Sequence, residues 1–168
     1  MWRKLTGTVL LSISSILLLI SLVTDYWVVI YDKDNRAHWG LWQMCSLGVC
    51  QNINSTIEYV VLVKGCLSFS AVLNALAILV AISSFAKWQI RHITGVLVTS
   101  IFTFFTALFV LVAMAVYTSE TPGMVLANSW GYSWSFILGW TALVFLISAD
   151  IFLCFDHYYS STTNYESL

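Results

Sequence analysis

The sequence predicts an all-α membrane protein, a bundle of four transmembrane helices with a small extracellular antiparallel β-sheet. Of its 168 residues, 60% are hydrophobic and 9% are charged, with a mean hydropathy of +0.86, whereas globular chains carry about 25% charged residues. Four long apolar stretches alternate with short polar ones, and two cysteines follow the first stretch. Because lipid must be the main solvent for this chain, we expect residues 1–168 to form a single four-span domain.

Each apolar stretch is long enough to cross a bilayer as a helix, which takes about 20 residues. The first follows a short basic start and resembles a signal peptide, but its length and the lack of a small-residue cleavage site favour a transmembrane helix. The expected spans cover residues 7–26, 60–85, 94–117 and 135–155, followed by a polar cytoplasmic tail at 156–168.

The positions of the basic residues predict which side of the membrane each loop and terminus is on. Arg3 and Lys4 precede the first span, and Lys87 and Arg91 lie in the turn between the second and third spans. Because cytoplasmic segments carry an excess of Lys and Arg, we expect both termini and this turn to be cytoplasmic. The two remaining loops are then extracellular or luminal. Lys64, at the outer end of the second span, is expected to snorkel to the interface or to pair with Glu58.

The first outer loop contains Cys45 and Cys50, with four residues between them. A cysteine pair that closes so short a loop in an oxidising compartment favours a disulfide. Zinc would require two further ligands, and His38 is the only other candidate in this stretch. The loop also contains strand-forming residues, so we expect three short antiparallel strands covered by the outer ends of the helices. Asn54 begins a glycosylation sequon, which is usable if the loop is luminal.

Two polar side chains lie within the predicted spans. Asn74 lies in the second span, where we expect an interhelical hydrogen bond. Asp150 lies in the fourth, about one turn from its cytoplasmic end. Intramembrane carboxylates are often functional, but the sequence offers no second buried acid or base for a proton relay. We expect Asp150 to reach the interface or to pair with a basic side chain at a neighbouring helix end. The candidates are Lys4, Lys87 and Arg91.

A motif extends from the first span into the outer loop and consists of Trp27, Gly40, Leu41, Trp42, Cys45 and Cys50. It resembles the W…GLW…C…C motif of the claudin superfamily, and the resemblance covers essentially the whole chain. The cysteine spacing and compact first loop are similar to the branch of peripheral myelin protein 22, the epithelial membrane proteins and lens fibre membrane intrinsic protein. Residues 113–120 and 133–140 are also similar to natural killer cell granule protein.

The resemblance implies a claudin-like fold and lateral (cis) assembly with the protein itself or with related four-span proteins, with contact in trans through the outer sheet. We expect Trp42 to pack the sheet onto the helix ends. The neighbouring Trp39 is open to two interpretations, packing of the same kind or contact with a partner.

The chain ends in Tyr165-Glu166-Ser167-Leu168, which has the Tyr-x-x-Leu form of endocytic and lysosomal sorting signals. Such a signal binds an adaptor as an extended peptide, with Tyr165 and Leu168 in two pockets and the backbone added to a sheet edge. The pattern is short and arises often by chance. The alternative use of this end is capture of the Leu168 carboxylate by a PDZ-type groove.

The sequence contains no catalytic, cofactor-binding or metal-binding constellation. The net charge of −1 gives no reason to expect nucleic acid as a partner. We therefore expect a non-enzymatic protein that organises cell–cell contacts or membrane domains, with the bilayer and four-span proteins as partners. One alternative is a granule or lysosomal membrane protein that controls traffic and exocytosis, with a sorting adaptor bound at its tail. The other is an auxiliary channel subunit.

Overall fold

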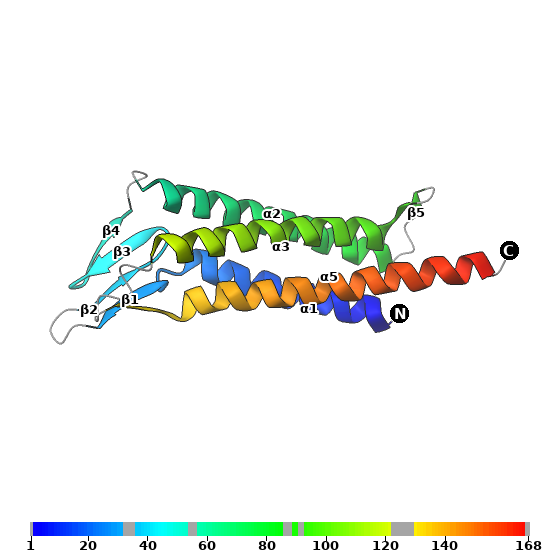
Figure 1. Ribbon diagram of the computed structural model, residues 1–168, viewed down its shortest axis with the longest axis horizontal. Coiled ribbons are helices and arrows are strands. Elements are labelled where there is room, and N and C mark those ends of the chain that lie inside the picture. Colours follow the sequence, from blue (N-terminus) through cyan, green and yellow to red (C-terminus); the bar gives the residue numbers. More distant parts are fainter. Residues whose placement is uncertain are drawn as a thin grey trace.

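The computed structural model describes residues 2–31, 36–53, 57–85, 89–90, 93–121 and 130–166 of the chain. Within these ranges, four helices contain a segment long and apolar enough to cross a membrane. They are α1 (Trp2–Val23), α2 (Glu58–Phe85), α3 (Gly95–Glu120) and α5 (Trp134–Glu166). The helices run side by side, with a β-sheet at one end of the bundle, and α1 begins and α5 ends at the opposite end (Figure 1). The predicted fold class is confirmed.

Each helix buries one stripe of its surface and leaves the rest of its apolar side chains exposed. In α1 the buried residues recur every three or four positions, including Leu11, Ser14 and Leu18. This spacing places them on one helical face. On the opposite face, Ile16 is 58% exposed although it is fully apolar. A surface of this kind is suited to contact with lipid rather than with water.

Small residues let the helices approach closely, as packing within a bilayer requires. A Cβ placed on Gly95 of α3 would lie 2.6 Å from the Cβ of Ser84 in α2. At the sheet end, the hydroxyl of Ser21 in α1 donates to the backbone oxygen of Ser135 in α5 at 2.7 Å. The hydroxyls of Thr24 and Ser135 lie 2.7 Å apart. These polar contacts join α1 to α5 where the sheet begins.

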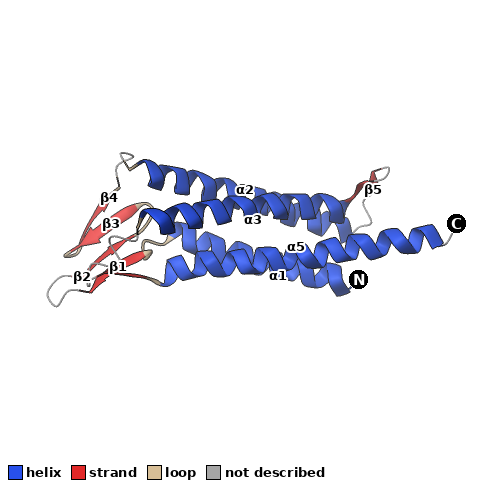
Figure 2. Ribbon diagram, in the orientation of Figure 1, coloured by secondary structure: helices blue, strands red, loops and turns tan. Residues whose placement is uncertain are grey.

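The outer sheet has five antiparallel strands in the order β4-β3-β2-β1-β7 (Figure 2). Its strands are β1 (Val28–Tyr31), β2 (Arg36–Trp39), β3 (Gln43–Ser46), β4 (Val49–Asn52) and β7 (Trp130–Tyr132). The sequence predicted three strands, all from the first outer loop. That loop instead forms four, β1 to β4. The fifth, edge strand β7, comes from the second outer loop, and Tyr132 pairs with Val28 across the sheet. At the other end of the bundle, β5 (Gln89–Ile90) and β6 (Ile93–Thr94) form a separate two-stranded sheet.

Helix α5 is longer than the predicted fourth span. The sequence indicated a span that ends at residue 155 and a polar tail thereafter, but α5 continues as helix to Glu166. Its membrane-spanning segment is Trp134–Tyr159. The last turns of α5 lie beyond the other helices at the end away from the sheet (Figure 1). The expected separation of span and tail is therefore not visible as a change of backbone structure.

Candidate functional site

Trp27 follows α1 and lies fully buried at the junction between the helices and the sheet, with an exposed fraction of 0%. Its Nε1 donates to the backbone oxygen of Ser21 at 2.8 Å. Its ring packs edge-on against Tyr117 and Phe136, with centroid separations of 4.7 and 6.0 Å. Its backbone nitrogen donates to the oxygen of Trp39 in β2 at 3.0 Å. Trp27 therefore joins three helices and the sheet through one side chain and its backbone.

Gly40 lies where the chain passes directly against Asp25. A Cβ at Gly40 would collide with the Cα of Asp25, so a larger residue requires the backbone to move. The carboxylate Oδ1 of Asp25 accepts from the backbone nitrogen of Gln43 at 3.2 Å. The nitrogen of Gly40 donates to the oxygen of Gln43 at 3.0 Å. This turn sets the position of the next residue, Leu41, which is 0% exposed.

Trp42 connects the sheet to α1 through its indole nitrogen. Nε1 donates to the backbone oxygen of Leu22 at 2.7 Å, which is one of the terminal carbonyls that an α-helix leaves without an intrahelical partner. The amine of Lys64 lies over the Trp42 ring at 5.2 Å, a cation–π contact. Trp42 is nevertheless 42% exposed. Trp42 therefore links the sheet to the end of α1 from a partly exposed position, and the fully buried tryptophan of the junction is Trp27. Among the described residues, Lys64 contacts the Trp42 ring and forms no ion pair with Glu58.

The predicted disulfide between Cys45 and Cys50 is confirmed. The two residues face each other across β3 and β4, with their Cα atoms 4.0 Å apart. The connecting turn places Leu47 and Gly48 at positive φ, 53° and 79°, as a two-residue hairpin turn of the mirror-image type requires. Leu47 is 71% exposed and Val49 is 62% exposed. The disulfide therefore holds a hairpin tip, residues 47–49, that presents two apolar side chains to the outside.

One connected structure therefore lies at the end of the four-helix bundle. It consists of Trp27, the turn of residues 40–42 and the disulfide between Cys45 and Cys50. The profile of the PMP-22/EMP/MP20/Claudin family matches residues 1–153. The chain belongs to this family. It is a family of structural, multi-pass membrane proteins. Of the motif residues in the chain, Trp27 and Trp42 join the outer sheet to the helices, and Cys45 and Cys50 close the hairpin of β3 and β4.

Three relatives in this family match most of the chain. Lens fiber membrane intrinsic protein of Rattus norvegicus is 31% identical over 143 residues, 83% of this chain and 83% of the relative. Claudin domain-containing protein 2 of Mus musculus is 33% identical over 162 residues, 93% of this chain and 88% of the relative. Protein NKG7 of Mus musculus is 32% identical over 157 residues, 89% of this chain and 88% of the relative.

Among the described residues, the hydrogen-bond partner of Asp150 is a hydroxyl group. Its Oδ1 accepts from the hydroxyl of Ser100 in α3 at 2.6 Å. Lys4 instead donates to the backbone oxygen of Ser84 in α2 at 2.6 Å, so pairing with Lys4, one of the alternatives expected for Asp150, is not formed. The amine is held at the end of α2, where it satisfies a terminal carbonyl. The other two candidates for pairing, Lys87 and Arg91, lie outside the described residues.

Asn74 does not form the expected interhelical hydrogen bond. Its side chain is 0% exposed, and neither its amide nitrogen nor its amide oxygen has a hydrogen-bond partner. The hydroxyls of Thr103 and Thr106 in α3 donate to carbonyls of their own helix. Such back-bonding is the common alternative for Ser and Thr in helices.

The remaining candidates lie at the margins of the described structure. Asn54 and Leu168 are outside the described residues, so the sequon and the last position of the sorting motif have no structural account. Tyr165 lies within α5, whereas the sorting mechanism needs an extended peptide. Cys66 and Cys154 are free thiols.

Sequence reasoning missed two parts of the outer structure. One is β7, although Trp130-Gly131-Tyr132 has the alternating aromatic pattern of a strand. Tyr132 stacks on Phe136 with a centroid separation of 4.1 Å, and so connects β7 to α5. The other is Asp25, whose contact with Gly40 depends on the tertiary fold and leaves no local pattern in the sequence.

Proposed function

We propose that this protein is a non-enzymatic organiser of cell–cell contacts or membrane domains. In this proposal it assembles laterally with itself or with related four-span proteins and presents the hairpin tip to a partner. Its termini are cytoplasmic and its sheet is outside the cell, as the basic residues near the N-terminus favour. Membership of a family of structural membrane proteins supports a role based on assembly rather than on catalysis.

The observation that carries the proposal is the conformation of Leu47. A left-handed backbone costs a non-glycine residue roughly 1–2 kcal/mol, and the leucine side chain gains little in return because it is 71% exposed. Asn or Gly would fit this turn position better. The turn requires a positive φ at this position but not a leucine, and a strained leucine there supports a functional role for its side chain. The neighbouring exposed Val49 extends the same apolar surface.

The position of the hairpin also supports contact with another protein. Strand β4 is an edge strand, and its four residues are all exposed. An edge strand offers unpaired backbone groups to a second chain. The sheet lies beyond the ends of the helices (Figure 1), so the tip is accessible to a neighbour in the same membrane and to one in an apposed membrane.

The test is Leu47→Asn, with Gln51→Ala on the same edge strand as the matched control. Lateral assembly is measured by energy transfer between two differently tagged copies in cells, together with enrichment at contacts between adjoining cells. We expect Leu47→Asn to lower both signals severalfold while the folded protein becomes about 1 kcal/mol more stable, because Asn tolerates positive φ. Gln51→Ala should leave both signals unchanged. Wild-type levels of assembly and contact enrichment in Leu47→Asn would refute the proposal.

The location of the tagged protein separates this function from the traffic alternative. We expect the wild type and Tyr165→Ala to collect equally at cell contacts. A wild type held in granules, with Tyr165→Ala displaced to the cell surface, would contradict the proposal and support a sorting signal in the tail. Co-purification with a channel would support the auxiliary-subunit alternative instead.

A further inference from the structure

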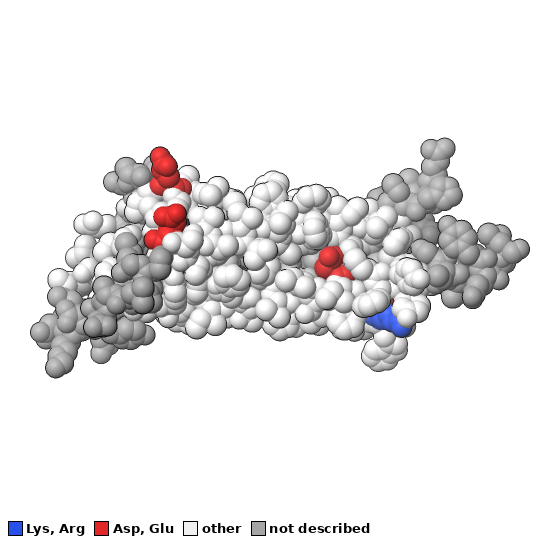
Figure 3. Space-filling view, in the orientation of Figure 1, with Lys and Arg blue, Asp and Glu red and all other residues white. Residues whose placement is uncertain are grey.

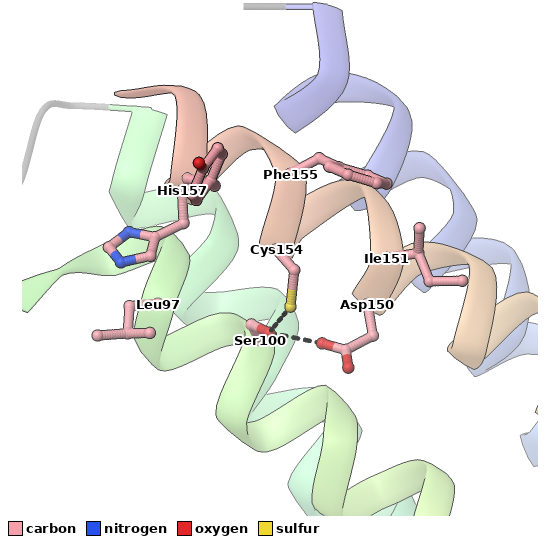
Figure 4. Close-up of a pocket in the computed structure, with 8 residues that line it drawn as sticks. Leu97, Ser100, Asp150, Ile151, Cys154, Phe155 and His157 are labelled. Carbon is pink, nitrogen blue, oxygen red and sulfur yellow. Dashed lines mark hydrogen bonds between the residues drawn. The ribbon is translucent and has the colours of Figure 1, made fainter. Parts of the chain in front are cut away.

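A groove opens on the flank of α3 and α5, in the half of the bundle away from the sheet, with a volume of about 690 Å³ (Figure 4). This volume is within the range of small-molecule sites, about 300–1,000 Å³. The groove has apolar walls, which include Leu97, Ile151 and Phe155, and a polar floor, which includes Ser100, Asp150 and Cys154. The side chains of Ile151 and Phe155 are 50% and 54% exposed. The groove is therefore accessible from the lipid-facing surface.

The polar floor is a connected row of three side chains. The hydroxyl of Ser100 donates to Asp150 at 2.6 Å and lies 3.1 Å from the sulfur of Cys154. Asp150 and Cys154 are four residues apart on α5, so they lie on the same helical face. Figure 4 shows both side chains directed toward Ser100 across the space between the two helices. The hydroxyl uses one carboxylate oxygen of Asp150, so the carboxyl group has further capacity to accept hydrogen bonds.

A carboxylate in a membrane span is costly unless a cation or hydrogen-bond donor compensates it. Asp150 lies within the span Trp134–Tyr159. The described Lys and Arg side chains have other contacts: Arg3 and Lys64 lie over aromatic rings, and Lys4 donates to a backbone oxygen. On the face shown in Figure 3, one acidic patch lies partway along the side surface of the helices, and the blue atoms in view lie farther toward the end away from the sheet. His157 also lines the groove, and its Nδ1 lies 3.2 Å from the hydroxyl of Thr94. The groove therefore has acceptor character, and no described Lys or Arg side chain lines it.

We propose that this groove binds a single-chain amphiphile with a primary amine, whose ammonium group contacts Asp150 and whose alkyl chain lies along the apolar walls. An ammonium group supplies both a positive charge and N–H donors, whereas a hydroxyl supplies a donor alone and an anionic headgroup would be repelled. The apolar walls provide the burial that an alkyl chain requires. The site is at the opposite end of the bundle from the hairpin tip, so it does not depend on the function proposed above.

The test uses the full-length protein in phosphatidylcholine nanodiscs, whose choline headgroups have no N–H donor. The probe is a long-chain primary amine with a photoreactive diazirine on its alkyl chain, compared with the alcohol of the same chain. We expect the amine to label groove residues of α3 and α5 and the unmodified amine to compete. Asp150→Asn should reduce this labelling about tenfold or more, as loss of a hydrogen bond to a charged group predicts. The alcohol should label weakly in both proteins.

The matched control is Ser148→Ala on the same helix, because the Ser148 hydroxyl donates only to the Val144 carbonyl of its own helix. Its labelling should equal that of the wild type. Leu97→Trp fills the groove and leaves Asp150 intact, so it should also reduce labelling. If Asp150→Asn fails to fold, as checked by gel filtration, the Leu97→Trp variant decides whether the amine binds in the groove. Wild-type labelling of the folded Asp150→Asn or Leu97→Trp variant would overturn the proposal. Equal labelling by the alcohol would also overturn the proposal and would favour a sterol-like ligand. A dimer whose second copy excludes the amine from the groove would overturn it as well.

Discussion

Replacing Gly40 with alanine tests whether the Gly-Leu-Trp turn needs glycine for space. The added Cβ would collide with the backbone of Asp25 as well as with its side chain, so no change of rotamer relieves the contact. Overpacking of this kind costs about 1–3 kcal/mol. Separating the two segments also weakens the hydrogen bonds from Gly40 to Gln43 and from Gln43 to Asp25, at about 1 kcal/mol each. We expect the free energy of unfolding to fall by about 3 kcal/mol.

The assay is equilibrium unfolding of the purified protein in mixed micelles, with an increasing mole fraction of a denaturing detergent and tryptophan fluorescence as the readout. Gly65→Ala is the matched control, because a Cβ at this position in α2 meets no atom within 4 Å. Alanine within a helix is favoured over glycine by about 0.5–1 kcal/mol, so this variant should be as stable as the wild type or slightly more so. An unchanged midpoint for Gly40→Ala, or equal destabilisation by both variants, would refute the steric reasoning.

Three further predictions use the same unfolding assay. Asn74→Leu should raise the free energy of unfolding by about 1 kcal/mol, because it removes a fully buried amide without a partner; a loss of stability would reveal a partner of the amide. Replacing both Cys45 and Cys50 with serine should lower the free energy of unfolding by about 2 kcal/mol, as expected for so short a closed loop. Reduction of the disulfide in the wild type should lower the free energy of unfolding by the same amount. Unequal losses from reduction and from the double substitution would argue against the loop-closure explanation. Trp42→Phe keeps an aromatic ring near Lys64 and loses the hydrogen bond to α1, so a loss of about 1 kcal/mol is expected. The loss should be larger in Trp42→Leu, and equal losses would show that the ring contact contributes nothing.

Sequence reasoning was reliable where the physical cause is local. Apolar runs of membrane-spanning length indicated the helices, because a helix in lipid forms all of its backbone hydrogen bonds within its own segment. The disulfide was predictable from the short spacing of Cys45 and Cys50, which suits a hairpin. Trp27, Gly40 and Leu41 were recognised as a motif, although the sequence did not show that the glycine leaves room for Asp25.

The missed features depend on partners far away in the chain. Strand β7 has three residues and is stabilised by pairing with β1, about 100 positions earlier, so its own sequence carries a weak signal. The lack of a partner for Asn74 depends on which atoms face it from other helices. The pairing of Asp150 with Ser100 depends likewise on the rotation of α3 against α5. Apolar periodicity indicates which face is buried, but not which polar atoms meet there.

The place of β7 in the sheet has a consequence for biogenesis. Strands β1 to β4 lie between α1 and α2 in the chain, so this part of the sheet can form once two helices have been inserted. The pocket around Trp27 is complete only when Tyr117 of α3 and Phe136 of α5 are in place. A nascent chain with either late helix misinserted would keep an uncovered tryptophan and an unpaired β1 edge. Exposed apolar surface and unpaired strand edges make incompletely folded chains prone to aggregation, the hazard that chaperones counter. The pairing of β7 with β1 therefore completes the sheet only after the segments that contribute α3 and β7 have been made.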